Sequence, residues 1–161
     1  MRTIDEWISE YGESHKNSTN KMIHWFCVPL IMLSLLALIE IIPFPLYTIE
    51  LFRIKGQSIY LNWTTLFLIF AVIFYIRLSL SIAIGMLLVA VLMLYSITWI
   101  KIYDPSVWKL SLVIFVLAWI GQFIGHKIEG KKPSFFEDIQ FLLIGPAWLL
   151  SFIYKKLGIK Y

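Results

Sequence analysis

The three histidines of the chain, His15, His24 and His126, are its strongest candidates for chemistry. Three neutral imidazoles form a ligand set that suits Zn²⁺, Fe²⁺ or Cu²⁺. An amide stands four residues before two of them, since Asn20 precedes His24 and Gln122 precedes His126. Side chains three or four positions apart share one face of a helix, so these amides are placed to orient the imidazoles. The sequence therefore predicts a metal site, although the spacing matches no common metal signature.

Glu129 follows His126 by three residues and shares a helical face with Gln122 and His126. It is a candidate fourth ligand, a candidate general base, or a partner that holds an imidazole tautomer. Cys27 lies three residues after His24, and we interpret it as a small packing residue rather than a ligand. The alternative interpretation of the whole group is that its polar side chains only solvate a helix end.

The composition places the chain in a membrane. Of its 161 residues, 60% are hydrophobic and 15% charged, whereas a soluble domain is about half apolar and about a quarter charged. A spanning helix needs about 20 apolar residues, and uncharged runs cover 22–39, 56–76, 78–100, 110–126 and 139–154. We expect an all-α integral membrane protein with four transmembrane helices and a short or re-entrant C-terminal helix.

We expect a single polytopic domain over residues 1–161. It divides into an interfacial helix and turn (1–20), four spans (21–126), and a basic turn with the C-terminal helix (127–161). The chain starts with polar and acidic residues, which predicts an uncleaved first span. The basic residues are not interleaved with aromatic ones, so nucleic acid is not an expected partner.

Residues 3–15 are predicted to form an amphipathic interfacial helix. Thr3 and Glu6 match a capping box. We expect residues 17–20 to break this helix and Asn20 to cap the first span, so that the short helix folds back toward it. Apolar, aromatic and imidazole side chains form one stripe along the helix, namely Ile4, Trp7, Ile8, Tyr11 and His15.

Charge predicts the orientation, because basic residues are enriched in cytoplasmic loops. Ten of the 14 basic residues fall on the side of the N-terminus if the last helix does not cross. An even number of spans also returns the chain to that side, so the three histidines would meet at one cytoplasmic interface. A bacterial inner membrane is the expected location, and the endoplasmic reticulum is the alternative.

Two segments carry the candidate residues at fixed spacings. They are Tyr11-x3-His15-x4-Asn20-x3-His24-x3-Val28-Pro29 and Trp119-x2-Gln122-Phe123-x-Gly125-His126-x2-Glu129-Gly130-x2-Pro133. Both resemble the motifs of the 2-hydroxy fatty acid dioxygenase family, and the second is the more specific. Gln140 and Gly145-Pro146 match more loosely. Cys27 departs from the family's usual Gly and Ser134 from its usual Ala, and both are changes between small residues.

The resemblance implies Fe²⁺-dependent α-oxidation in the pathway from phytosphingosine to odd-chain fatty acids. A long-chain 2-hydroxy fatty acid and O₂ would give the acid one carbon shorter, CO₂ and water. The carbinol and carboxylate of the substrate supply four electrons, so 2-oxoglutarate is not expected. Iron held by His15, His24 and His126 would keep positions open for O₂ and for the hydroxy-carboxylate.

Several further residues are candidates for the substrate. The carboxylate would be attracted by Lys127, Lys131 or Lys132, which are otherwise ordinary positive-inside residues. Tyr11 would either hydrogen-bond at the site or belong to the interfacial aromatic belt. Because the acyl tail is already dissolved in lipid, we expect the head group rather than the tail length to govern recognition.

Two other functions fit the same residues. A zinc-dependent membrane lipid hydrolase would use the same histidines, and a non-enzymatic membrane scaffold or metal carrier would need no catalytic group. A carrier is disfavoured, because Arg77 is the one charged residue between Gly56 and Ile100.

Overall fold

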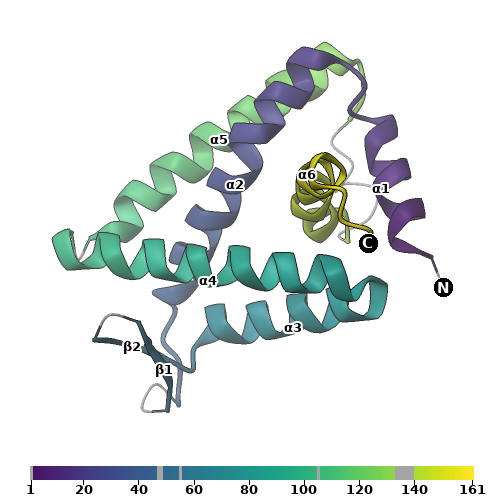
Figure 1. The fold of residues 1–161 in the computed structure, drawn as a ribbon. Helices are drawn as coiled ribbons and strands as arrows, with labels where there is room; N and C mark the ends of the chain where they lie inside the picture. The colour runs from purple at the N-terminus through teal and green to yellow at the C-terminus, as the bar shows by residue number, and fades with distance from the viewer. Residues whose placement is uncertain (1, 47–48, 55, 105, 133–139) are drawn as a thin grey trace.

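The computed structural model describes residues 2–46, 49–54, 56–104, 106–132 and 140–161 (Figure 1). Lys55, Pro133 and Ser134, which entered the charge and motif arguments, lie outside these ranges. The described elements are six helices and one hairpin: α1 (Ile4–Glu13), α2 (Ser18–Glu40), β1 (Glu50–Ile54), β2 (Gln57–Tyr60), α3 (Trp63–Leu78), α4 (Leu80–Tyr103), α5 (Val107–Glu129) and α6 (Phe141–Leu157).

Three of the described helices, α2, α4 and α5, are long and apolar enough to cross a membrane. This confirms a helical membrane architecture. The predicted second span, 56–76, is not one helix. Its first part forms β2, which pairs antiparallel with β1. Helix α3 begins only at Trp63, after its cap Asn62. At 16 residues, α3 is shorter than the usual range of about 17–25. A fourth span therefore stays a prediction, and the hairpin was not foreseen.

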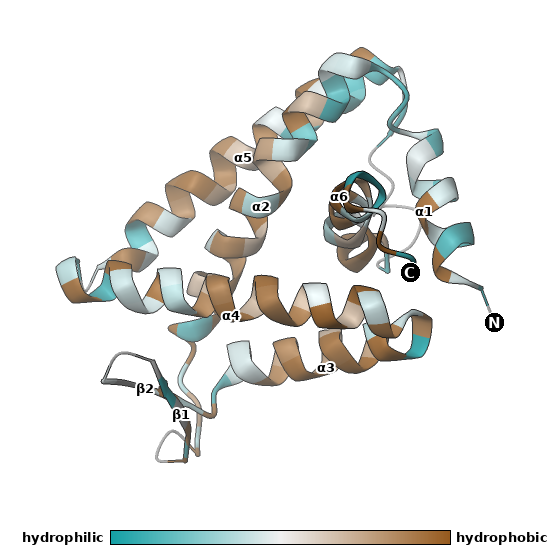
Figure 2. Ribbon diagram, viewed as in Figure 1, coloured by the Kyte–Doolittle hydropathy of each residue, from teal (hydrophilic) through white to brown (hydrophobic). Residues whose placement is uncertain are grey.

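Helices α2 to α5 form two antiparallel pairs, and α6 lies between these pairs and α1. Figure 1 shows α2 alongside α5 and α3 alongside α4, with the β-hairpin at the end away from the chain termini. In Figure 2, hydrophobic residues cover most of α2 to α5, whereas hydrophilic ones gather on α1 and where α2 begins and α5 ends. The polar end that carries the histidines is therefore also the end to which α1 attaches.

The predicted N-terminal helix is confirmed in its capping box and in its apolar face. Thr3 and Glu6 exchange both capping hydrogen bonds. The apolar stripe packs against α6, where the rings of Trp7 and Phe141 lie 5.4 Å apart. The helix ends at Glu13, so His15 lies in the following turn rather than on the helix. The buried residues of the stripe are Ile4, Trp7, Ile8 and Tyr11.

The predicted cap of the first span was wrong by three residues. Asn17 caps α2, because its Oδ1 accepts the backbone N–H groups of Thr19 and Asn20. Asn20 lies inside the helix and is fully buried. An Asx side chain bonds most readily two or three residues ahead, and Asn17 is the residue with the extended backbone that a cap requires.

Two glycines allow α2 and α5 to approach closely. Gly121 and Gly125 are four residues apart on α5, the small-xxx-small spacing of close membrane helix pairs. A Cβ atom at Gly121 would lie 2.7 Å from Cys27 Sγ, and one at Gly125 would collide with Asn20 Oδ1. The spacing of the two glycines is visible in the sequence, but the close helix contact was not predicted from it. This contact explains why Cys27 is a packing residue.

We predict that Gly125→Ala lowers the melting temperature of the detergent-solubilised protein, because the new methyl group collides with Asn20 at the α2–α5 contact. Overpacking of this kind costs about 1–3 kcal/mol. Gly12→Ala is the matched control, since its methyl group would lie 3.6 Å from Trp148 Nε1, an ordinary contact distance. Equal melting of Gly125→Ala and wild type would contradict the need for glycine there.

Candidate metal centre

The three histidines meet at the polar end of the helix pair. His15 lies in the turn between α1 and α2, His24 lies in the second turn of α2, and His126 lies in the last turn of α5. Their ring centroids are 4.3–5.0 Å apart, and each side chain is buried, with at most 4% exposed. One nitrogen of each ring lies within 4.8 Å of the others. The predicted convergence is therefore present in the fold.

Backbone carbonyls set the orientation of two rings. His15 Nδ1 lies 2.6 Å from the Tyr11 carbonyl oxygen, and His24 Nδ1 lies 2.9 Å from that of Asn20. A carbonyl oxygen only accepts, so each Nδ1 carries the proton and donates it. The Nε2 atoms are left as lone-pair donors to a metal. The predicted pairing of the Asn20 amide with His24 was wrong, because the backbone carbonyl of Asn20 fills that role.

The two Nε2 atoms, of His15 and His24, face each other at 2.9 Å. Two lone pairs at this distance repel unless a proton or a cation lies between them. When two nitrogens each lie about 2.1 Å from one ion and the nitrogen–metal–nitrogen angle is about 90–110°, the nitrogens are about 3.0–3.4 Å apart. The separation in the protein is close to that range, so a shared divalent cation fits this pair.

His126 supplies the third nitrogen. Its Nδ1 is buried, and no hydrogen-bond partner for it exists among the described residues. A buried polar atom without a partner is rare and costly. Its ring centroid lies 5.0 Å from those of both His15 and His24. One nitrogen of the His126 ring lies within 4.8 Å of a ring nitrogen of each of the other two histidines, so the three imidazoles form a donor set that fits a metal ion.

Burial keeps the ligands in the form that binds metal. Loss of solvent, reinforced by the neighbouring His24, lowers the pKa of His15 to about 3. The imidazole is therefore neutral at physiological pH, as coordination requires. Burial also raises the pKa of Tyr11, so its hydroxyl stays protonated.

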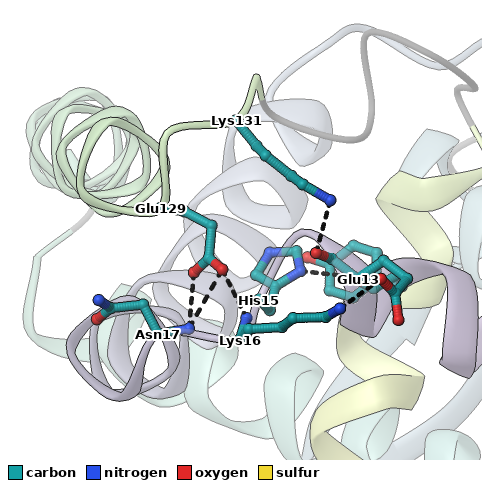
Figure 3. A network of polar contacts seen from close by, with 7 residues as sticks. Glu13, His15, Lys16, Asn17, Glu129 and Lys131 are labelled. Atoms are coloured by element: carbon teal, nitrogen blue, oxygen red, sulfur yellow. Dashed lines mark hydrogen bonds and ion pairs between the residues drawn. The ribbon is translucent and has the colours of Figure 1, made fainter.

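Glu129 ties the last turn of α5 to the turn that carries His15. Its carboxylate accepts the backbone N–H groups of Lys16 at 2.8 Å and Asn17 at 2.9 Å (Figure 3). It also accepts the Asn20 side-chain amide at 3.0 Å. A carboxylate is also favoured at the N-terminus of a helix, here α2. These bonds favour the interpretation of Glu129 as a partner that positions the histidines over that of a fourth ligand.

The lysines of the basic turn differ from one another. Lys131 Nζ donates to the Glu13 carbonyl oxygen at 2.8 Å and so closes the C-terminal end of α1 (Figure 3). Lys127 and Lys132 are exposed. Binding of a carboxylate by Lys131 would therefore break its contact to α1.

Aromatic rings enclose the histidines. Tyr11 stacks on His15, with centroids 4.2 Å apart and planes 13° from parallel. Trp148 of α6 lies 5.1 Å from the same imidazole. Gln122 lies beside the His24 ring and lines a cavity with Tyr11 and His126. Trp148 was missed by the sequence analysis, because nothing in its local pattern distinguishes it from a packing aromatic.

We predict that metal-free protein becomes less stable as the pH falls from about 7.5 to about 5. The folded state keeps His15 neutral, whereas the unfolded chain binds a proton near its ordinary pKa of 6.5. Stability is therefore greatest above pH 6.5 and falls toward the folded pKa of about 3. Thermal melting in detergent measures this, and His15→Gln should show a shallower dependence. Identical pH dependence of the two proteins would contradict a buried neutral His15.

Comparison with known proteins identifies the family of the chain. A family model described as 2-hydroxy-palmitic acid dioxygenase Mpo1-like matches residues 1–157. The 2-hydroxy-palmitic acid dioxygenase MPO1 of Saccharomyces cerevisiae is 30% identical over 151 residues, which is 92% of this chain and 78% of that protein. No solved structure gives a significant match. The chain therefore belongs to the Mpo1-like 2-hydroxy-palmitic acid dioxygenase family.

Proposed function

We propose that the protein is an Fe²⁺-dependent dioxygenase of 2-hydroxy fatty acids. The substrate and O₂ would yield the acid one carbon shorter, CO₂ and water. The observation that carries this proposal is the buried cluster of His15, His24 and His126, with two Nε2 atoms 2.9 Å apart and an unpartnered Nδ1. Membership of the family supports the substrate class.

The three imidazoles favour a divalent transition-metal ion that is neither strongly hard nor strongly soft. Three imidazoles without a thiolate suit Fe²⁺ and also Zn²⁺, and Cys27 packs against Gly121 outside the cluster. When bound, Fe²⁺ supplies open coordination positions and the electron transfer that reaction with O₂ requires. The carbinol and carboxylate carbons of the substrate lose four electrons, which reduce O₂, so the reaction balances without 2-oxoglutarate or another reductant.

The protein's own groups would orient the substrate and exclude water. The Tyr11 hydroxyl, protonated because it is buried, and the Gln122 amide line the same cavity as His126. Both can donate hydrogen bonds to a carboxylate or a hydroxyl oxygen. The aromatic rings around His15 keep water away, which strengthens these bonds.

We place the head group at the cytoplasmic interface, as the distribution of basic residues favours. Lys127 and Lys132, both exposed, would attract the incoming carboxylate. Glu129 would act as a positioning residue, through its bonds to the turn between α1 and α2. A bacterial inner membrane is the proposed location.

The decisive experiment is metal analysis of protein purified without added metal, together with O₂ consumption on a long-chain 2-hydroxy acid. Bound iron, O₂ uptake and formation of the acid one carbon shorter would support the proposal. Bound zinc, without O₂ uptake, would favour a lipid hydrolase instead.

We predict that His24→Ala and His126→Ala each lose metal and turnover, yet still insert into the membrane, because insertion depends on the apolar helices. Lys16→Ala is the matched control beside His15: its side chain forms an exposed ion pair with Glu13, which contributes little stability. Metal content, turnover and membrane fraction should all be measured. Full metal content in either histidine variant would assign that residue a structural role.

We predict that Glu129→Gln weakens metal binding by about 10–100-fold, the usual effect of losing a group that orients ligands. The new amide donor would face the backbone N–H groups of Lys16 and Asn17, which need an acceptor. Competition with a chelator measures the affinity. Unchanged affinity with a large loss of turnover would instead identify Glu129 as a general base.

A further inference from the structure

An apolar cavity leads away from the metal centre into the helix bundle. Its polar end is formed by Tyr11, Gln122 and His126. Beyond them the lining comes from all four of α2 to α5 and from α6, and no charged side chain belongs to it among the described residues. Tyr75 is a further polar residue of the lining, and its hydroxyl donates a hydrogen bond to the Leu143 carbonyl oxygen at 2.7 Å. The cavity therefore offers polar groups at one end only.

The depth from the histidines to the end of the cavity lining matches one long acyl chain, although the space between the side chains is narrow, about 90 Å³. Along α2, the lining runs from Val28 to Leu36, and Leu36 is twelve residues beyond His24. Twelve residues of helix extend about 18 Å. The hydrocarbon core of a bilayer is about 30 Å thick, so one lipid acyl chain fills a layer of about 15 Å. A chain with its head group at the histidines would reach the far end of this cavity.

The far end of the lining meets a separate hydrophobic cluster. Leu36 is 2% exposed and packs with Ala37 and Ile97, and Phe67 and Leu68 pack against this group. The Thr64 hydroxyl donates to the Leu36 carbonyl oxygen at 2.9 Å, which fixes α3 against α2 at this depth. A chain that is too long would therefore meet packed side chains rather than lipid.

We propose that this cavity holds the acyl chain of the substrate and that the packed side chains at its far end, Leu36, Phe67 and Leu68, select the chain length. The inference rests on the proposed function for the identity of the head group. It changes the expectation drawn from the sequence, in which the tail stays in lipid and its length matters little. A rigid wall discriminates by shape even when transfer from lipid contributes no free energy.

Substitutions along the cavity test this proposal. Ala90 is a buried lining residue on α4, so Ala90→Leu reduces the available space, and Phe67→Ala enlarges the far end of the cavity. Val91→Phe is the matched control, because Val91 is the next residue, is 41% exposed and does not line the cavity. Turnover is measured on a series of saturated 2-hydroxy acids that differ by two carbons, with metal content checked for each variant.

We expect Ala90→Leu to shift the preferred substrate to shorter acids, with a loss of about 10-fold or more for the longest, since one methylene in a fitted pocket changes specificity by about 10–200-fold. Phe67→Ala should shift the preference to longer acids, and Val91→Phe should keep the wild-type profile. An unchanged length profile in both Ala90→Leu and Phe67→Ala would overturn the proposal, even though the wild type is active.

A binding measurement separates this inference from the proposed function. Unsubstituted saturated fatty acids should raise the melting temperature of the metal-free protein, with a dependence on length that Ala90→Leu and Phe67→Ala shift in the same directions. If no 2-hydroxy acid is turned over but this dependence is found, the proposed function fails and the acyl cavity stands. Stabilisation that is independent of chain length would overturn the acyl cavity.

Discussion

Contact between α2 and α5 is close enough to leave no room for a Cβ atom at Gly121 or Gly125, and the metal centre depends on this proximity. His24 and His126 lie on these two helices, and their rings meet because the helices do. Glu129 closes the same pair at its polar end by accepting backbone N–H groups before α2. His15 is brought in by the turn that this carboxylate holds. One helix contact thus positions all three imidazoles.

Burial of the imidazoles has a cost that a cation would remove. The carbonyl oxygens of Tyr11 and Asn20 fix two tautomers so that two Nε2 lone pairs face each other, and His126 Nδ1 has no partner among the described residues. Such an arrangement destabilises the metal-free protein. We infer that fold stability and metal binding are coupled, because an ion in this cluster would remove the repulsion between the two Nε2 lone pairs.

Sequence reasoning succeeded where the physical rule is local. The capping box of Thr3 and Glu6 and the buried stripe of α1 were predicted from spacings within one helix. It failed where two local rules competed, as at Asn17 and Asn20, which are both cap-forming residues in one short turn. It also failed for residues 57–60, because an apolar run of this length does not distinguish a helix from a strand followed by a helix.

The sequence by itself determined the helical membrane class, since the length of the apolar runs decides it. It also predicted that the three histidines meet, although the four-span topology behind that argument stays a prediction. Tertiary structure alone decided which nitrogens face each other, that Trp148 encloses His15, and that an apolar cavity begins at His126. The physical reason is that these features arise between helices distant in the chain. Their geometry depends on how closely the helices pack, which periodicity within any one of them does not encode.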